Sequence, residues 1–185
     1  MKRAVVLVLI AGLLCGCGGT DPQLQRAMGL RAKLLGNSCI FDAEITADYG
    51  DKLYTFSVYC EGDSKGNLGF SLTSPDTISG ITGSIASGTG KLTFGETALA
   101  FPLLADDQVT PVSAPWLLLK TLQSGYLTSV GTDGEFLQVT IHDSYEEDAL
   151  QLDIWLDDQD IPVRADIFYD GRRILALTIT NFQIL

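Results

Sequence analysis

The sequence predicts a mainly β domain of the α+β class. We expect a strongly curved antiparallel sheet or incomplete barrel of about 8 to 11 strands, with an N-terminal helix and a short apolar lid helix. From residue 39 onward, apolar and polar residues mostly alternate, and turn residues recur every 8 to 12 positions or so. Residues 21–36 show helical spacing instead, and the apolar segment 109–123 interrupts the alternation.

The first twenty residues indicate an export signal and a tether. A basic start, Lys2 and Arg3, precedes the uncharged apolar run 4–14, as in secretory signal peptides. This run is too short for a transmembrane helix, which needs about 20 apolar residues. We expect residues 1–16 to be a cleaved lipoprotein signal peptide and residues 17–20 a lipidated tether. A single domain would then span residues 21–185.

The cleavage site is similar to a lipobox. Leu14 lies three residues before Cys17, and the small residue Gly16 lies directly before it. Cys15 departs from that pattern, since Ala, Ser or Thr is commoner there. The resemblance implies that Cys17 carries acyl chains such as palmitate and anchors the protein to a cell membrane or cell envelope, facing the periplasm or the exterior. The alternative is an ordinary secretory signal that leaves Cys17 as a plain thiol.

The N-terminal helix has a clear start and end. Asp21 can cap it, Pro22 suits the first helical position, and Gly36 can end it. Its apolar residues recur at helical spacing: Leu24, Ala27, Met28, Leu30, Leu34 and Leu35.

Residues 39–47 and 54–60 predict a hairpin that carries the two remaining cysteines. A two-residue turn at 49–50 places Phe41 opposite Val58 and Cys39 opposite Cys60, with the apolar pairs on one face. An even number of cysteines in an oxidising compartment favours a disulfide between Cys39 and Cys60. Two buried free thiols are the alternative.

The remaining chain supplies further strands and one more helix. Strands are predicted near residues 68–73, 78–85, 91–94, 98–101 and 150–156. The turn sequences Asp133-Gly134 and Asp170-Gly171 predict two more hairpins. Residues 109–123 contain the run Trp116 to Leu119 and predict an apolar helix, which either fills one side of the sheet as core or covers a lipid-sized cavity.

The charge balance excludes some partners. Residues 17–185 keep ten of the twelve basic residues and all 23 acidic ones, a formal net charge of −13. Such a surface repels both nucleic-acid phosphates and anionic lipid head groups. We expect no nucleic-acid partner, and membrane attachment through acyl chains alone.

The sequence offers little for catalysis or metal binding. No Gly-x-Ser-x-Gly, His-Glu-x-x-His or phosphate-binding loop is found. The single histidine, His142, precedes Asp143 and Ser144, but neighbours along a strand point to opposite faces, which argues against a hydrolase. The acidic clusters 146–148 and 157–160 lack the spacing of a calcium loop. We expect no enzyme, no metal and no cofactor.

The order of elements, with segments such as 166–173 and 178–182, resembles the LolA-like superfamily of bacterial lipoprotein- and lipid-binding proteins, which includes the LolA, LolB and LppX types. The resemblance implies a half-barrel whose apolar cavity holds acyl chains beneath lid helices, here in a lipid-anchored member. Carried over, it implies that eight residues line the cavity: Phe41, Phe56, Val58, Phe70, Trp116, Leu118, Leu119 and Leu122.

These observations favour a membrane-anchored, non-catalytic lipoprotein that binds an acyl chain or another apolar ligand in a half-barrel cavity. The alternative is a structural or regulatory lipoprotein whose core is filled and whose surface binds a partner protein. A large apolar cavity would favour the first function, and a packed interior would favour the second.

Overall fold

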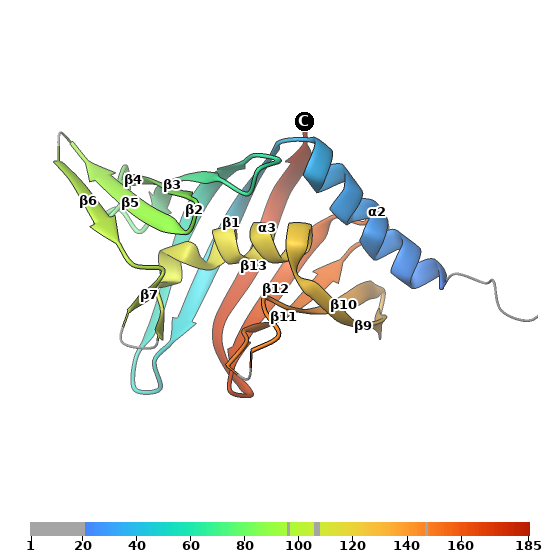
Figure 1. The fold of residues 1–185 in the computed structure, drawn as a ribbon. Coiled ribbons are helices and arrows are strands. Elements are labelled where there is room, and N and C mark those ends of the chain that lie inside the picture. Colours follow the sequence, from blue (N-terminus) through green and yellow to red (C-terminus); the bar gives the residue numbers. More distant parts are fainter. Residues whose placement is uncertain (1–20, 96, 106–107, 147) are drawn as a thin grey trace, which may run out of the picture.

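In the computed structural model, which describes residues 21–95, 97–105, 108–146 and 148–185, eleven strands form one antiparallel sheet (Figure 1). Their order is β6-β5-β4-β3-β2-β1-β13-β12-β11-β10-β9, so the first strand pairs with the last. The elements are α2 (Pro22–Gly36), β1 (Cys39–Asp48), β2 (Leu53–Gly62), β3 (Leu68–Ser74), β4 (Thr82–Ala86), β5 (Thr89–Phe94), β6 (Thr97–Phe101), β7 (Leu104–Ala105), β8 (Gln108–Val109), η1 (Pro111–Ser113), α3 (Ala114–Ser124), β9 (Tyr126–Asp133), β10 (Phe136–His142), β11 (Gln151–Leu156), β12 (Pro162–Tyr169) and β13 (Arg172–Ile184).

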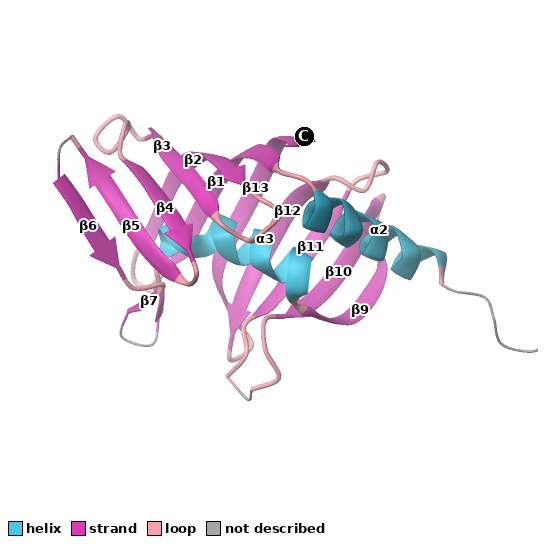
Figure 2. Ribbon diagram, turned by 45° about the horizontal axis from the view of Figure 1, so that its top comes forward, coloured by secondary structure: helices cyan, strands magenta, loops and turns pink. Residues whose placement is uncertain are grey.

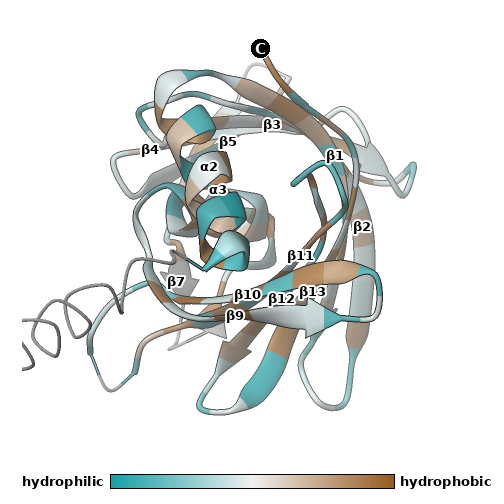
Figure 3. Ribbon diagram, turned by 90° about the vertical axis from the view of Figure 1, so that its right-hand side faces the viewer, coloured by the Kyte–Doolittle hydropathy of each residue, from teal (hydrophilic) through white to brown (hydrophobic). Residues whose placement is uncertain are grey.

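The sheet is strongly curved and unclosed, and its concave side holds α3 (Figures 2 and 3). Helix α2 contacts α3 and β9 near one end of the sheet. The core lies between the inward-facing side chains of the sheet and the two helices. The predicted fold class is therefore confirmed, including the N-terminal helix and the short apolar helix past the middle of the chain.

The predicted register of the first hairpin is wrong by two residues. Strands β1 and β2 pair Asp48 with Leu53, so the connection has four residues rather than two. The Asp48 carboxylate accepts a hydrogen bond from the Gly50 backbone N–H at 2.7 Å, and Gly50 has a φ of +88°. This side-chain bond stabilises a longer turn, a role for which aspartate is well suited.

The shift separates the two cysteines that were predicted to pair. Cys39 lies opposite Gly62, and Cys60 lies opposite Phe41. Both are buried free thiols, so the predicted disulfide is not present in the structure. A shift of two residues keeps every side chain on its original face, which is why the hydrophobic pattern could not distinguish the two registers.

Of the two later hairpins, one keeps its predicted turn, and the other is shifted by two residues, since Val130 pairs with Val139 rather than with Leu137. Tyr169 pairs with Arg172, which confirms the turn at 170–171. In the other hairpin Asp133 pairs with Phe136, so the connection is 134–135 and lies one residue beyond the predicted turn.

Candidate functional site

The eight residues predicted to line a cavity lie together in the core. None is more than 8% exposed: Phe41, Phe56, Val58, Phe70, Trp116, Leu118, Leu119 and Leu122. A side chain that lined a large empty cavity would be accessible to a water-sized probe, so these side chains are covered by other protein atoms. The part of the concave face beneath α3 is therefore filled by the chain itself.

Helix α3 packs closely on the strands below it. A Cβ added to Gly62 of β2 would lie 2.4 Å from Leu119 Cδ2 and 3.1 Å from Cys39 Sγ. The glycine therefore provides the space that Leu119 occupies. Between α2, α3 and the sheet, a remaining void of about 10 Å³ is lined by residues that include Leu30 and Leu122.

Polar contacts fix α3 at both ends. The Trp116 indole Nε1–H donates to the Gly66 carbonyl at 2.8 Å. The buried Gln123 amide donates to the carbonyls of Leu34, at 3.1 Å, and Asp63, at 3.0 Å. These bonds join α3 to α2 and to the β2–β3 connection, so α3 is anchored at several points rather than held at one hinge.

Arg31 of α2 completes the attachment of α3. Its guanidinium donates to the carbonyls of Leu122 and Gly125, both at 2.8 Å, and of Thr121, at 3.4 Å. The last carbonyls of a helix have no partner within the helix, and a cation is favourable there. Burial lowers the pKa of Arg31.

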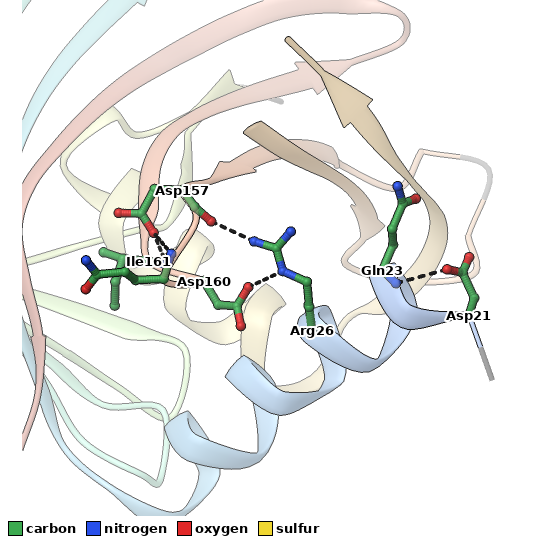
Figure 4. A network of polar contacts seen from close by, with 7 residues as sticks. Asp21, Gln23, Arg26, Asp157, Asp160 and Ile161 are labelled. Carbon is green, nitrogen blue, oxygen red and sulfur yellow. Dashed lines mark hydrogen bonds and ion pairs between the residues drawn. The ribbon is translucent and has the colours of Figure 1, made fainter. Parts of the chain in front are cut away.

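Helix α2 is in turn tied to the β11–β12 connection (Figure 4). Arg26 Nε lies 2.6 Å from Asp160 Oδ1, and its Nη2 donates to the Asp157 carbonyl at 2.8 Å. Asp157 Oδ1 accepts from the Ile161 backbone N–H at 2.8 Å and shapes this turn. Asp21 caps α2, as predicted, by accepting from the Gln23 backbone N–H.

The two buried thiols are suited to packing rather than chemistry. Burial raises the pKa of Cys39 to about 11 and the pKa of Cys60 well above its ordinary value. Both therefore stay neutral near pH 7, and a neutral thiol is a poor nucleophile. In the described part of the chain, no three His, Cys, Asp or Glu residues are grouped so that they could hold a metal ion.

Beyond α3, the apolar concave face continues onto strands β4, β5 and β6, which we call the wing. One row runs from Phe70 of β3 through Gly83 and Leu92 to Leu99, because each of these residues pairs with the next. Side chains that pair directly share a face. Exposure rises along the row from 4% at Phe70 to 66% at Leu99, and Leu92 is intermediate.

Strands β5 and β6 contribute four apolar side chains to the inner face of the wing: Leu92, Phe94, Leu99 and Phe101. Phe94 lies on the same face as Leu92 because it is two residues further along β5, and it is 68% exposed. The Phe101 ring lies over Gly90, where an added Cβ would be 2.3 Å from the ring. Leu92 and Phe101 pack against the edge of the core.

The sequence prediction missed this surface. The segments 91–94 and 98–101 were expected to be strands, and their alternation does place Leu92, Phe94, Leu99 and Phe101 on one face. What the sequence could not show is that α3 contacts β2, β10 and β13, and that within the described residues Phe94 and Leu99 of the wing stay exposed.

A polar cluster lies on the convex side of the sheet. Asp166 is 3% exposed and forms ion pairs with Arg164 and Arg173, and Arg164 lies 4.2 Å above the Trp155 ring. The Trp155 indole donates to Asp133 at 2.9 Å. An open depression of about 690 Å³ lies beside Trp155 and Arg164. These groups neutralise one another, so the cluster fits a structural role.

The fold is an unclosed half-barrel in which α3 fills one part of the concave face and apolar side chains of β5 and β6 stay exposed on another part. No protein-family model matches the sequence, and no curated protein matches it. Among the described residues, no helix is long and apolar enough to cross a membrane.

Three solved structures show what this fold is similar to. An uncharacterized conserved protein from Thermus thermophilus has a TM-score of 0.47 and 12% identity, over 88% of this chain and 87% of that one. A putative outer membrane lipoprotein-sorting protein domain from Vibrio parahaemolyticus has a TM-score of 0.46 and 8% identity, over 87% and 91%. A LolA superfamily protein from Nitrosomonas europaea has a TM-score of 0.43 and 10% identity, over 86% and 93%. The superfamily that the sequence resembles is thus among the similar structures.

Proposed function

We propose that this protein is a membrane-anchored, non-catalytic binding protein for an acyl chain or a similar apolar ligand. The ligand lies on the inner face of the wing rather than under α3. The observation that carries the proposal is the apolar row from Phe70 to Leu99, which leaves the core and ends two-thirds exposed. The anchor at Cys17 lies outside the described residues and is supported by the lipobox-like sequence.

The chemistry of the inner face supports an apolar ligand. Single exposed apolar residues are common on proteins, but Leu92, Phe94, Leu99 and Phe101 are contiguous and continue the core. An acyl chain needs no hydrogen-bonding partner and can lie along these side chains. Complete burial of a Leu or Phe side chain contributes about 1.5 to 3 kcal/mol.

A second function is favoured by the filled interior. Because the eight predicted lining residues are packed core, the chain also fits the alternative of a structural or regulatory lipoprotein that binds a partner protein. In that case the exposed apolar side chains of the wing would contact the partner rather than a lipid. Binding of a free fatty acid distinguishes the two functions.

The test is the binding of a fluorescent fatty acid by wild type, Phe94→Ser and Leu99→Ser. Each substitution should weaken binding about tenfold, since a loss of about 1.4 kcal/mol corresponds to that factor. Stability should change by less than about 0.5 kcal/mol, because both side chains are exposed. Denaturant unfolding of the ligand-free proteins measures this second quantity.

Leu53→Ser is the matched control, since Leu53 is 67% exposed but lies at the start of β2, away from the wing. It should bind like wild type. A wild type that takes up no fatty acid, or equal losses in all three variants, would exclude the wing as an acyl-chain site.

A further inference from the structure

Strand β6 forms one end of the sheet and, within the part of the chain that the structure describes, lacks the usual protection of an edge strand. Its sequence, Thr-Ala-Leu-Ala-Phe, contains no charge and no proline, and Ala98, Leu99 and Ala100 are exposed. Natural edge strands commonly carry charges or proline, or are covered by another element. The opposite edge strand, β9, ends in Asp133 and contacts α2. Of the two edge strands, β9 therefore carries a charge and contacts a helix, whereas β6 carries no charge and has exposed side chains.

The free backbone groups of β6 can be assigned from its pairing with β5. Phe94 pairs with Thr97 across a two-residue connection, so this pair exchanges both backbone hydrogen bonds. Bonded and non-bonded pairs then alternate along an antiparallel ladder. Thr97, Leu99 and Phe101 therefore bond to β5, while Ala98 and Ala100 direct their N–H and C=O groups away from it.

We propose that β6 pairs with β6 of a second copy of this chain, antiparallel, about a two-fold axis at Leu99. In this register Ala98 lies opposite Ala100 of the partner subunit, and Ala100 lies opposite Ala98 of the partner subunit. Each pair exchanges two backbone hydrogen bonds, so all four free groups of each strand are satisfied. Leu99 faces Leu99 of the partner subunit in a non-hydrogen-bonded pair, with a Cα separation of about 4.5 Å.

The strand fits a second copy because its sequence is nearly symmetric about Leu99. Small alanine side chains flank the axis on both sides, and no charged pair is brought together in a chain of net charge −11. The axis is normal to the sheet, so the inner faces of both wings lie on the same side and Leu99 of each copy is covered. The contact is smaller than a standard interface of about 1,600 Å², so we expect a reversible dimer.

Cross-linking tests the register. Under mild oxidation, Leu99→Cys should form a covalent dimer, because the two introduced thiols face each other across the axis. Thr97→Cys should not, since position 97 lies opposite Phe101 of the partner subunit. Cys39 and Cys60 are buried and add little background. Equal cross-linking of both variants, or none in either, would overturn the proposed pairing.

Sedimentation equilibrium tests the backbone bonds. Ala100→Pro removes one outward N–H that β5 does not use, and an edge strand tolerates proline there. It should weaken association at least tenfold relative to wild type, with an unchanged melting temperature. Thr132→Pro is the control, because Thr132 of the other edge strand also directs its N–H outward: Asp133 exchanges hydrogen bonds with Phe136, and Thr132 is the next residue along β9. A wild type that stays monomeric at all concentrations, or a dimer unaffected by Ala100→Pro, would refute the proposal.

The proposed dimer can be disrupted without changing the side chains of the proposed ligand site. Ala100 is not on the inner face, so Ala100→Pro should still bind fatty acid if the wing is an acyl-chain site. Should Ala100→Pro fail to fold, the cross-linking comparison still decides the register.

Discussion

Gly62 shows how a single residue sets the distance between α3 and the sheet. Its backbone needs no unusual φ, so its conformational freedom is not the reason for glycine. The reason is space, because Leu119 Cδ2 lies only 2.4 Å from the position that a Cβ would take. Leu119 is 2% exposed and belongs to the core that fills the concave face. The stability of variants at these two positions therefore tests whether α3 is packed as part of the core or covers an open cavity as a lid.

We expect Gly62→Ala to destabilise the protein by about 1 to 3 kcal/mol through overpacking, and Leu119→Ala by about 2 to 5 kcal/mol through a cavity. The double variant should cost less than the sum, because the shortened Leu119 leaves space for the new Cβ. Urea unfolding measures all three. Gly69→Ala is the control, since its nearest neighbour would lie 3.9 Å away. Additive effects would contradict the direct contact.

Between the two helices, Arg31 is the main polar connection. Arg31→Ala leaves the carbonyls at the end of α3 without their donor, and we expect a loss of about 1 to 3 kcal/mol. Arg31→Lys should restore only part of it, because one ammonium group cannot reproduce the planar fork. Lys33→Ala, at an exposed position of the same helix, should change stability by less than about 0.5 kcal/mol. Thermal unfolding of the three variants tests this, and equal stability of Arg31→Ala and Lys33→Ala would show that Arg31 is not needed.

Elements with a local signal could be predicted from the sequence, and their long-range pairing could not. Asp21 and Pro22 mark the start of α2 because capping depends on adjacent residues. The register of β1 and β2 depended on whether Asp48 would stabilise a four-residue turn, and both registers bury the same face. The disulfide prediction failed for the same reason, since it relied on that register.

For the molecule as a whole, the alternating pattern identified the curved sheet, but not which part of it α3 would cover. That position depends on contacts between residues far apart in sequence, such as Leu119 with Gly62 and Gln123 with Leu34. The eight residues predicted to line a cavity lie together in a filled core beneath α3, and their part in ligand binding stays a prediction. The exposed apolar surface lies further along the same face, on the wing.

This arrangement predicts an uneven distribution of stability across the sheet. Strand β1 lies between β2 and β13, and its inward side chains from Cys39 to Ala47 are at most 2% exposed. Strands β5 and β6 pair in series at the end of the sheet, and most of their side chains are exposed or intermediate. Regions with few buried apolar contacts open at a lower free energy than the core.

Hydrogen exchange followed by mass spectrometry should therefore find the amides of β5 and β6 exchanging at least tenfold faster than those of β1 and β13. A fatty acid bound to the wing should slow exchange in β5 and β6 and leave β1 unchanged, because only the wing amides lie under the ligand. The Leu99→Ser variant provides the control, since it should show the same fast exchange without protection by the fatty acid. Uniform exchange across the sheet would show that the wing belongs to the same cooperative unit as the core, and protection centred on β1 and β2 would place the ligand under α3 instead.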